Sequence, residues 1–238
     1  MKNILIAVAV LAFAVGCGPK KIVDHEPETA ATTAETGEGE TAPEGAGSTA
    51  VKEQPAKTEV VELTEKLTEE TLPDNLTLSF DIKDFGKIKA ELFVADAPKS
   101  SLNIANLAIS GFYKGLKFHR LVPGFVIQGG DPDGTGGGGP GYTVPAEIKH
   151  KHEKGCLAMA RKPDEVNPKK ESSGSQFYFC LEALPELDGG YTVLGQITEG
   201  MDVLEKMSQV KAGKKDKPLT PIVMEKVTVT TVKTIPQP

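Results

Sequence analysis

Apolar and polar residues alternate along two neighbouring stretches near the middle of the chain. Residues 76–82 read Leu-Thr-Leu-Ser-Phe-Asp-Ile, and the residues that follow Gly86 place Ile88, Ala90 and Leu92 between charged neighbours. A period of two is typical of a strand with one buried face. The pattern therefore predicts two paired antiparallel strands that turn near Gly86.

Two other segments carry the spacing of amphipathic helices. Residues 98–109 begin with a proline, place Leu102 and Ile109 on one face and are followed by Gly111. Proline at a first helical turn and glycine just past the last turn are the usual end signals. A second, shorter helix is predicted over residues 201–207.

Short apolar stretches bounded by glycines make up most of the rest, and the last of them covers residues 223–232. Many short strands with only two helices favour a mainly β fold, a closed antiparallel barrel. About 165 residues are enough for one such domain with a good core.

The first residues differ from this pattern. Lys2 is followed by an unbroken apolar run over residues 4–15, which is too short to span a bilayer but suits a signal peptide. The run ends in Ala-Val-Gly before Cys17, which resembles a bacterial lipobox in which the cysteine is acylated. We therefore expect a signal peptide over residues 1–16 and a lipoprotein of the bacterial cell envelope, anchored in a membrane through Cys17. An ordinary cleaved secretory signal is the alternative.

A linker is expected over residues 17–73. Residues 18–73 carry five Lys against thirteen Asp or Glu, a net charge of −8, while the whole chain is −6. With Lys2 counted separately, residues 74–238 total +1. A segment this acidic and poor in apolar residues cannot offset its ordering entropy and is expected to be an extended, disordered spacer. Residues 59–71 alone have a weak helical spacing, which is a short helix or nothing.

Three ordered motifs carry the chemistry. They are Phe-His-Arg-Leu-Val-Pro-Gly-Phe-Val-Ile-Gln-Gly-Gly-Asp over residues 118–131, Gly-Ser-Gln-Phe-Tyr-Phe over 174–179, and Leu-Asp-Gly-Gly-Tyr-Thr-Val-Leu-Gly over 187–195. Together they resemble the cyclophilins, the peptidyl-prolyl cis/trans isomerases, across residues 74–234. The resemblance implies a closed eight-stranded antiparallel barrel capped by two helices, with no cofactor and no metal.

The resemblance also implies roles for individual residues. Arg120 matches the catalytic arginine, and Gln128 the glutamine that orients it. The substrate-binding positions are Phe125, Val126, Ala160, Gln176, Tyr178, Leu187 and Tyr191.

The residues themselves support the role of Arg120. An unpaired charge within an apolar run is costly, so a surface role is the weaker interpretation. Rotation about an Xaa-Pro bond meets a barrier near 18–20 kcal/mol from amide resonance. A fixed guanidinium can donate to the prolyl nitrogen as that resonance is lost, which lysine could not imitate.

The chain departs from the family pattern at several positions. Val126 stands where methionine is frequent, and Tyr178 where phenylalanine is common, so a buried hydroxyl needs a partner. Glu186 falls where cyclosporin-binding members have tryptophan, which predicts weak cyclosporin binding. The loop over residues 162–173 is about five residues longer than usual, and it is where substrate preference could be set.

Three weaker patterns favour plain structural roles over chemical ones. His119 is expected to be packed and hydrogen-bonded rather than a base. A metal site at His150 and His152 is disfavoured because no carboxylate or thiol set accompanies them. Asp131 begins a calcium-like loop that lacks its final glutamate, and the glycines after it are expected to turn the backbone beside the groove.

Two cysteines lie in the predicted domain. If the flanking strands pair, Cys156 comes near Cys180. Two buried thiols are favoured over a disulfide because cross-strand geometry is restrictive.

The expected function is isomerisation of proline-containing polypeptides among exported or envelope proteins. We expect the protein to be a monomer. We also expect it to bind no nucleic acid, because the net charge of the domain is near zero and the domain has no run of basic residues. A non-catalytic chaperone module that binds proline peptides, and a purely structural lipoprotein, are the alternatives.

Overall fold

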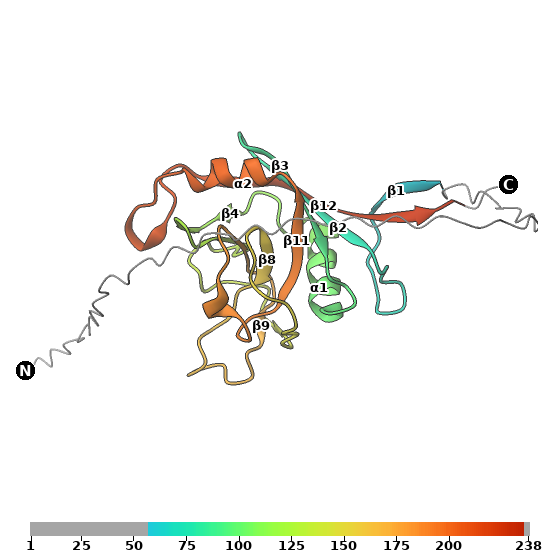
Figure 1. Cartoon of the computed structure of the whole chain (residues 1–238), viewed down its shortest axis with the longest axis horizontal. Helices are drawn as coiled ribbons and strands as arrows, with labels where there is room; N and C mark the ends of the chain where they lie inside the picture. Colours follow the sequence, from blue (N-terminus) through green and yellow to red (C-terminus); the bar gives the residue numbers. More distant parts are fainter. Residues whose placement is uncertain (1–56, 236–238) are drawn as a thin grey trace, which may run out of the picture. The chain divides into compact units, whose positions relative to one another are not determined.

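A computed structural model describes residues 57–235. The expected signal peptide, the acylated Cys17 and most of the expected linker lie outside these residues. The described part is mainly β with two α-helices, as predicted (Figure 1). None of the helices in this part is both long and apolar enough to cross a membrane.

The elements follow one another in short succession. The strands are β1 (Thr58–Leu63), β2 (Leu76–Ile82), β3 (Gly86–Leu92), β4 (Lys117–Phe118), β5 (Arg120–Val122), β6 (Val126–Gly129), β7 (Thr143–Val144), β8 (Cys156–Met159), β9 (Ser172–Ser173), β10 (Phe177–Cys180), β11 (Val193–Glu199) and β12 (Ile222–Thr234). The helices are α1 (Pro98–Ile109) and α2 (Met201–Ser208), with short 3₁₀ turns η1 (Pro185–Leu187) and η2 (Lys214–Asp216).

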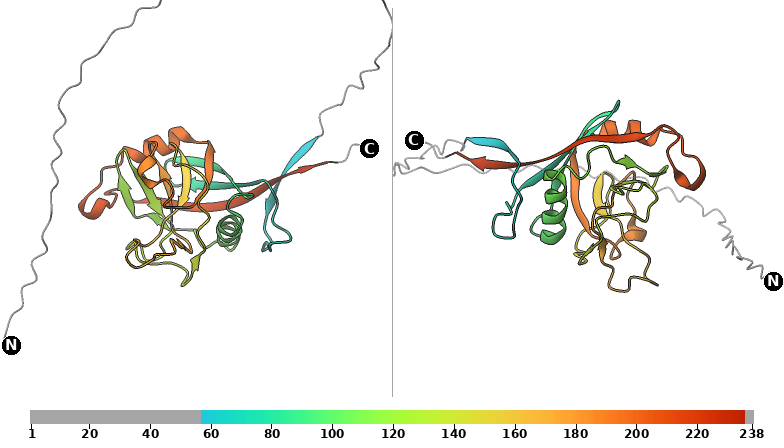
Figure 2. Two further views of the ribbon diagram at one scale, coloured as in Figure 1. Left: turned by 60° about the horizontal axis from the view of Figure 1, so that its bottom comes forward. Right: turned by 180° about the vertical axis from the view of Figure 1, so that it is seen from behind.

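Ten of the strands form one antiparallel sheet in the order β1-β12-β2-β3-β11-β8-β10-β6-β5, with β4 paired to β12. Only His119 separates β4 from β5, so the two are halves of one bent strand. If β4 and β5 count as one strand and β1 is left out, eight strands remain. Each pairs with the next from β12 to β6, β6 pairs with β5, and β4 pairs back with β12, so the pairings form a closed ring. The two helices lie at opposite ends of these strands (Figures 1 and 2).

The core lies between the strands and is built around four phenylalanines. Phe80, Phe118, Phe177 and Phe179 are at most 1 % exposed, and five pairs of these rings have centres 5.3–6.3 Å apart. All five pairs are tilted or edge-to-face, the arrangements that aromatic quadrupoles favour. Leu78 and Ile88 pack here as the alternating pattern predicted.

The helix α1 receives its N-terminal cap from another part of the chain. Its own N-cap residue, Ala97, offers no side-chain acceptor. The Glu147 carboxylate instead accepts the backbone N–H groups of Lys99 (3.0 Å) and Ser100 (2.8 Å) and the Ser100 hydroxyl (2.7 Å). These bonds satisfy donors that a helix leaves free and place a negative charge at the positive end of its dipole.

The structure differs from the prediction at residues 57–73. Residues 58–63 form the strand β1, not a helix or an unstructured spacer, and Thr58 pairs with Thr234 while Leu63 pairs with Val229. Figure 2 shows β1 lying along the outer end of β12. After β1, Leu67 is buried, and its backbone N–H donates to the Asn106 side chain of α1 at 2.7 Å. The ordered chain therefore begins before residue 74.

Candidate active site

One small hollow collects the residues that the motifs single out. Its volume is about 140 Å³. Its lining consists of Arg120, Phe125, Val126, Gln128, Ala160, Arg161, Tyr178, Leu187 and Tyr191. All of these except Arg161 were expected from the sequence. The remaining predicted residue, Gln176, is buried and bonded to Gln128.

Strand register explains why residues from distant motifs meet. Arg120 on β5 stands opposite Gln128 on β6, which in turn stands opposite Tyr178 on β10. Side chains in one such row project from the same face of a sheet. Val126, two residues before Gln128, belongs to this face as well. Three neighbouring strands therefore present a cation, an amide and an aromatic ring side by side.

The Arg120 side chain is 37 % exposed, and its guanidinium is held between two partners. The guanidinium carbon lies 5.9 Å from the centre of the Phe125 ring. Its Nε lies 3.5 Å from a carboxylate oxygen of Asp216, in the turn η2. Asp216 and the preceding Lys215 both have positive φ values, 58° and 57°. Sequence reasoning missed Asp216, which is 96 residues away and has no motif around it.

A chain of polar contacts runs from Gln128 away from the pocket. The Gln128 amide donates to the Gln176 side-chain oxygen at 2.9 Å. The Gln176 amide donates to the carbonyls of Gly136 (3.1 Å) and Gly138 (2.8 Å) in the glycine-rich loop. Since both donors and the acceptor of Gln176 are engaged, this side chain has one orientation. The loop thus lies beside the site and supports it.

Asp131 organises that loop. Its carboxylate accepts backbone N–H groups from Asp133 (2.8 Å), Thr135 (2.9 Å), Gly136 (2.6 Å) and Gly138 (3.2 Å). Burial raises the pKa of Asp131, but these four donors outweigh burial and hold the pKa below its ordinary value. A Cβ at Gly138 would overlap a carboxylate oxygen of Asp131, so only glycine fits there. The calcium-like sequence is therefore a hydrogen-bonded turn.

His119 is packed as predicted, but the prediction that it is hydrogen-bonded is wrong. The residue is 8 % exposed, and neither ring nitrogen has a partner among residues 57–235. Burial lowers the pKa of His119; nearby Asp131 acts in the opposite direction, and Arg120 adds to the lowering. Burial therefore favours the neutral form of the ring.

The Tyr178 hydroxyl has the partner that its burial requires. It lies 3.0 Å from Nε2 of His152, whose Nδ1 lies 3.0 Å from a carboxylate oxygen of Asp188. Burial raises the pKa of Tyr178, while the bond to His152 lowers the pKa of Asp188. His150 contacts Asp96 at 2.8 Å instead, so the two histidines have separate carboxylate partners. Residues 57–235 contain no cluster of three or more metal-ligating side chains.

The two cysteines of the domain are adjacent, and no disulfide bond joins them in this structure. Their sulfur atoms lie 3.0 Å apart, and both side chains are buried in the cluster behind Tyr178. The contact with Cys156, together with burial, raises the pKa of the Cys180 thiol. The predicted proximity of the cysteines is confirmed.

Larger hollows lie elsewhere among the described residues and contain none of the predicted site residues. One, of about 590 Å³, borders the C-terminal end of α2, and two others, of about 730 Å³ and 340 Å³, border α1. Residues of the motifs line the smaller hollow, which is the size of a few methylene groups rather than of a large ligand.

Comparison with known proteins gives results that agree with the geometry. The family described as "Cyclophilin type peptidyl-prolyl cis-trans isomerase/CLD" matches residues 77–229. A peptidyl-prolyl cis-trans isomerase of Helicobacter pylori is 47 % identical over 129 residues, which cover 52 % of this chain and 76 % of that protein. Peptidyl-prolyl cis-trans isomerase B of Bacillus subtilis is 46 % identical over 132 residues, covering 54 % and 88 %.

Solved structures give the same result. The crystal structure of a cyclophilin type peptidyl-prolyl cis-trans isomerase of Cryptosporidium parvum superposes with a TM-score of 0.61 at 34 % identity, covering 65 % of this chain and 97 % of that chain. A second structure of it, in the presence of the dipeptide Ala-Pro, has a TM-score of 0.59 at 33 % identity and covers 64 % and 98 %.

Proposed function

Since the chain belongs to the cyclophilin type peptidyl-prolyl cis-trans isomerase family and is an isomerase of that kind, we propose that Arg120 is its catalytic donor. We further propose that the protein acts on exported or envelope proteins as a membrane-anchored monomer. The observation that carries the catalytic part is that Arg120 lines the same hollow of about 140 Å³ as Phe125, Val126 and Tyr178.

The reaction needs a proline ring to be held while the bond before it turns. Rotation requires the prolyl nitrogen to lose its planarity and to localise its lone pair, which a nearby N–H donor stabilises. The Arg120 guanidinium supplies that donor at every physiological pH. Phe125, Val126 and Tyr178 supply the apolar walls.

The two glutamines and the remaining pocket residues have supporting roles in this proposal. Gln128 stands beside Arg120 in the register of β5 and β6, and it orients the guanidinium. Gln176 orients Gln128 and, with Ala160, flanks the substrate backbone. Leu187 and Tyr191 close the proline pocket.

The cellular part of the proposal is based on the sequence before the domain. Residues 4–15 are apolar and end just before Cys17 in small residues, the arrangement of an acylated lipoprotein. Two or three acyl chains hold a protein firmly because each buried CH₂ contributes about 0.8 kcal/mol. The acidic segment after Cys17 would set the isomerase away from the lipid surface, where exported chains fold.

Catalysis is tested on the full chain with a proline peptide, by protease-coupled kinetics or exchange NMR. Arg120→Ala should lower kcat/KM by about 10²–10³, the loss typical of removing a donor aimed at a transition state. Arg120→Lys should recover little of the rate, because a lysine lacks the rigid fork. Lys117→Ala, an exposed basic residue of β4, is the matched control and should retain the rate. Peptide binding without any exchange would support the chaperone module instead.

Anchoring is tested separately by expressing the full chain and its Cys17→Ser variant with labelled fatty acid. The wild type should incorporate label and sediment with membranes, and the variant should do neither. Equal labelling of the two proteins would refute acylation at Cys17 without affecting the catalytic proposal.

A further inference from the structure

Arg161 is the one residue of the pocket lining that was not predicted from the sequence. It directly follows Ala160, and its side chain is only 7 % exposed. The guanidinium carbon lies 4.6 Å from the centre of the Tyr191 ring. Its Nε donates to the Gly190 carbonyl at 2.6 Å. One side chain thus contacts two consecutive residues of the wall that closes the pocket.

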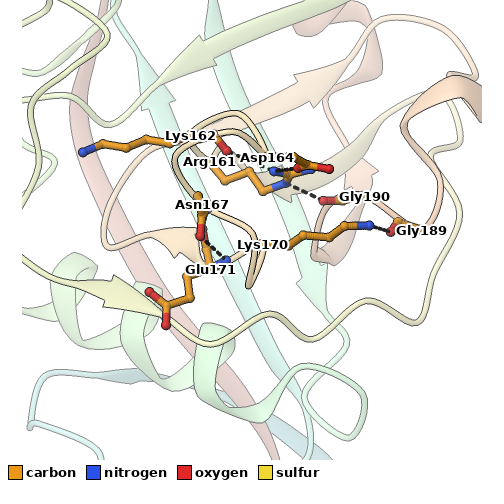
Figure 3. Close-up of polar contacts among 8 residues, drawn as sticks. All are labelled: Arg161, Lys162, Asp164, Asn167, Lys170, Glu171, Gly189 and Gly190. Atoms are coloured by element: carbon orange, nitrogen blue, oxygen red, sulfur yellow. Dashed lines mark hydrogen bonds and ion pairs between the residues drawn. The ribbon is translucent and has the colours of Figure 1, made fainter.

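The loop after Arg161 holds this side chain from the other direction. Nη1 donates to the Lys162 carbonyl at 3.0 Å and also to the Asp164 carboxylate. Figure 3 shows the guanidinium between Asp164 and Gly190, with the Lys162 side chain directed away from both. A buried guanidinium is stable only when its N–H groups are paired in this way.

The loop is itself closed by local bonds. The Asn167 side chain donates to the Glu171 carbonyl at 2.8 Å and accepts the Glu171 backbone N–H at 3.0 Å. Between these residues Lys170 has a φ of 55°, and its ammonium donates to the Gly189 carbonyl at 2.9 Å. Both ends of the loop therefore reach the same short segment, Gly189–Tyr191 (Figure 3).

We propose that Arg161 is a positioning residue that holds Tyr191 and Gly190 in place as a wall of the proline pocket, with loop 162–171 fixing Arg161. A planar guanidinium can stack on a ring and donate in its own plane at the same time, which a lysine ammonium cannot. This inference rests on the proposed role of Tyr191 in substrate binding.

Arg161 acts on the binding of the peptide and not on its turnover. The Nε and Nη1 atoms of Arg161 donate to the wall and to the loop, whereas the donor proposed for the reaction is Arg120. Loss of Arg161 should therefore loosen the captured proline ring and leave the exchange rate of bound peptide nearly unchanged.

Exchange NMR on the full chain with an Ala-Pro peptide measures the Kd and the exchange rate of the bound peptide separately. Arg161→Met, which keeps the apolar stem, should raise the Kd about tenfold, the loss expected for a desolvated cation–π contact and its paired bond. Arg161→Ala should do the same, and Arg161→Lys should recover only part of the affinity. The exchange rate should change by less than about twofold, since transition-state contacts stay in place.

A double-variant cycle tests whether Arg161 acts through Tyr191. In a Tyr191→Leu background, Arg161→Met should cause little further rise in Kd. A rise that persists there, or a Kd like that of wild type in Arg161→Met, would overturn the inference. Lys162→Ala is the matched control, and its Kd should equal that of wild type. A wild type that binds the peptide without exchange would count against the proposed catalysis, while the Kd comparison would still decide the role of Arg161.

Discussion

Replacing Asp131 by asparagine should loosen the loop that supports the two glutamines of the site. Oδ2 accepts three backbone N–H groups and Oδ1 accepts one. Asparagine keeps one oxygen, so its amide would face at least one of these donors. Charge-assisted bonds contribute about 1.5–3 kcal/mol each and are not additive, so we expect a loss of about 2–4 kcal/mol in the free energy of unfolding.

That loss leaves the protein folded, because domains of this size have about 5–15 kcal/mol of stability. It corresponds to a fall in Tm of about 5–15 °C for a domain of 150–250 residues. The rate should fall as well, because Gln176 is bonded to two carbonyls of the loop. A side chain displaced by about 1 Å can cost up to 10²-fold in rate, and we expect about tenfold in kcat/KM here.

Urea unfolding followed by circular dichroism and protease-coupled kinetics on the same samples measure both effects. Asp133→Asn is the matched control, since Asp133 is exposed and only two residues away, and it should change the free energy by less than about 0.5 kcal/mol. If Asp131→Asn were as stable as this control, the hydrogen-bond argument would be refuted. A destabilised variant with the wild-type rate would show that the loop does not position Gln176.

Three further outcomes are expected. Glu147→Ala removes three hydrogen bonds from the start of α1 and should lower the free energy of unfolding, measured with denaturant, by about 2 kcal/mol. The catalytic rate should not change, because α1 contributes no residue to the pocket. A slower enzyme would show that the cap of α1 also affects the active site. Tyr178→Phe keeps the ring but leaves Nε2 of His152 without its partner, so stability should fall by about 1–2 kcal/mol and kcat/KM by less than about threefold. A loss beyond tenfold there would give the hydroxyl a direct role in the reaction. Burial lowers the pKa of His119 in the folded state below its ordinary value of 6.5. As the pH falls below 6.5, His119 therefore binds a proton more readily in the unfolded protein than in the folded one. The free energy of unfolding should decrease over the pH range between 6.5 and the folded-state pKa. Between pH 7.5 and 5, the free energy of unfolding measured in urea should therefore decrease more steeply in wild type than in His119→Leu, by up to about 1.4 kcal/mol per pH unit. Parallel curves for the two proteins would refute this effect of His119.

Local pattern was enough to predict the elements that have one buried face. Residues 76–82 are the strand β2, residues 98–109 are the helix α1, and the second helix differs only at its last residue. In β2 and α2 the period of the apolar residues agrees with their burial. In α1 the pattern predicted the helix but not its buried face, which consists of Ser100, Ser101, Ile104, Ala105 and Ala108, whereas Leu102 and Ile109 are only partly buried. The strand β1 has no such face, since most of its residues are exposed and its partner strand lies more than 160 residues later. Pairing of that kind leaves no local pattern.

The site divides in a similar way. The motifs indicated the residues that line the pocket, and burial of Tyr178 indicated that its hydroxyl needs a partner. That this partner is His152, and that Asp216 contacts Arg120, depends on how the strands and turns are brought together in space. A histidine or an aspartate can have several chemically reasonable roles in a protein. Its actual role depends on which residues the tertiary structure places next to it.

The supporting contacts share one property that explains why they evade sequence reasoning. Asp131, Glu147 and Arg161 all direct their charges at backbone groups, which every residue has. A side chain that bonds to another side chain leaves two chemical signatures in the sequence, whereas one that bonds to backbone leaves only its own. Around this pocket the backbone partners are the glycine-rich loop and the Gly189–Gly190 turn, where no side chain intervenes. A charged residue next to a glycine-rich motif is therefore the signal to look for, because such a motif offers accessible N–H and C=O groups for that charge to hold.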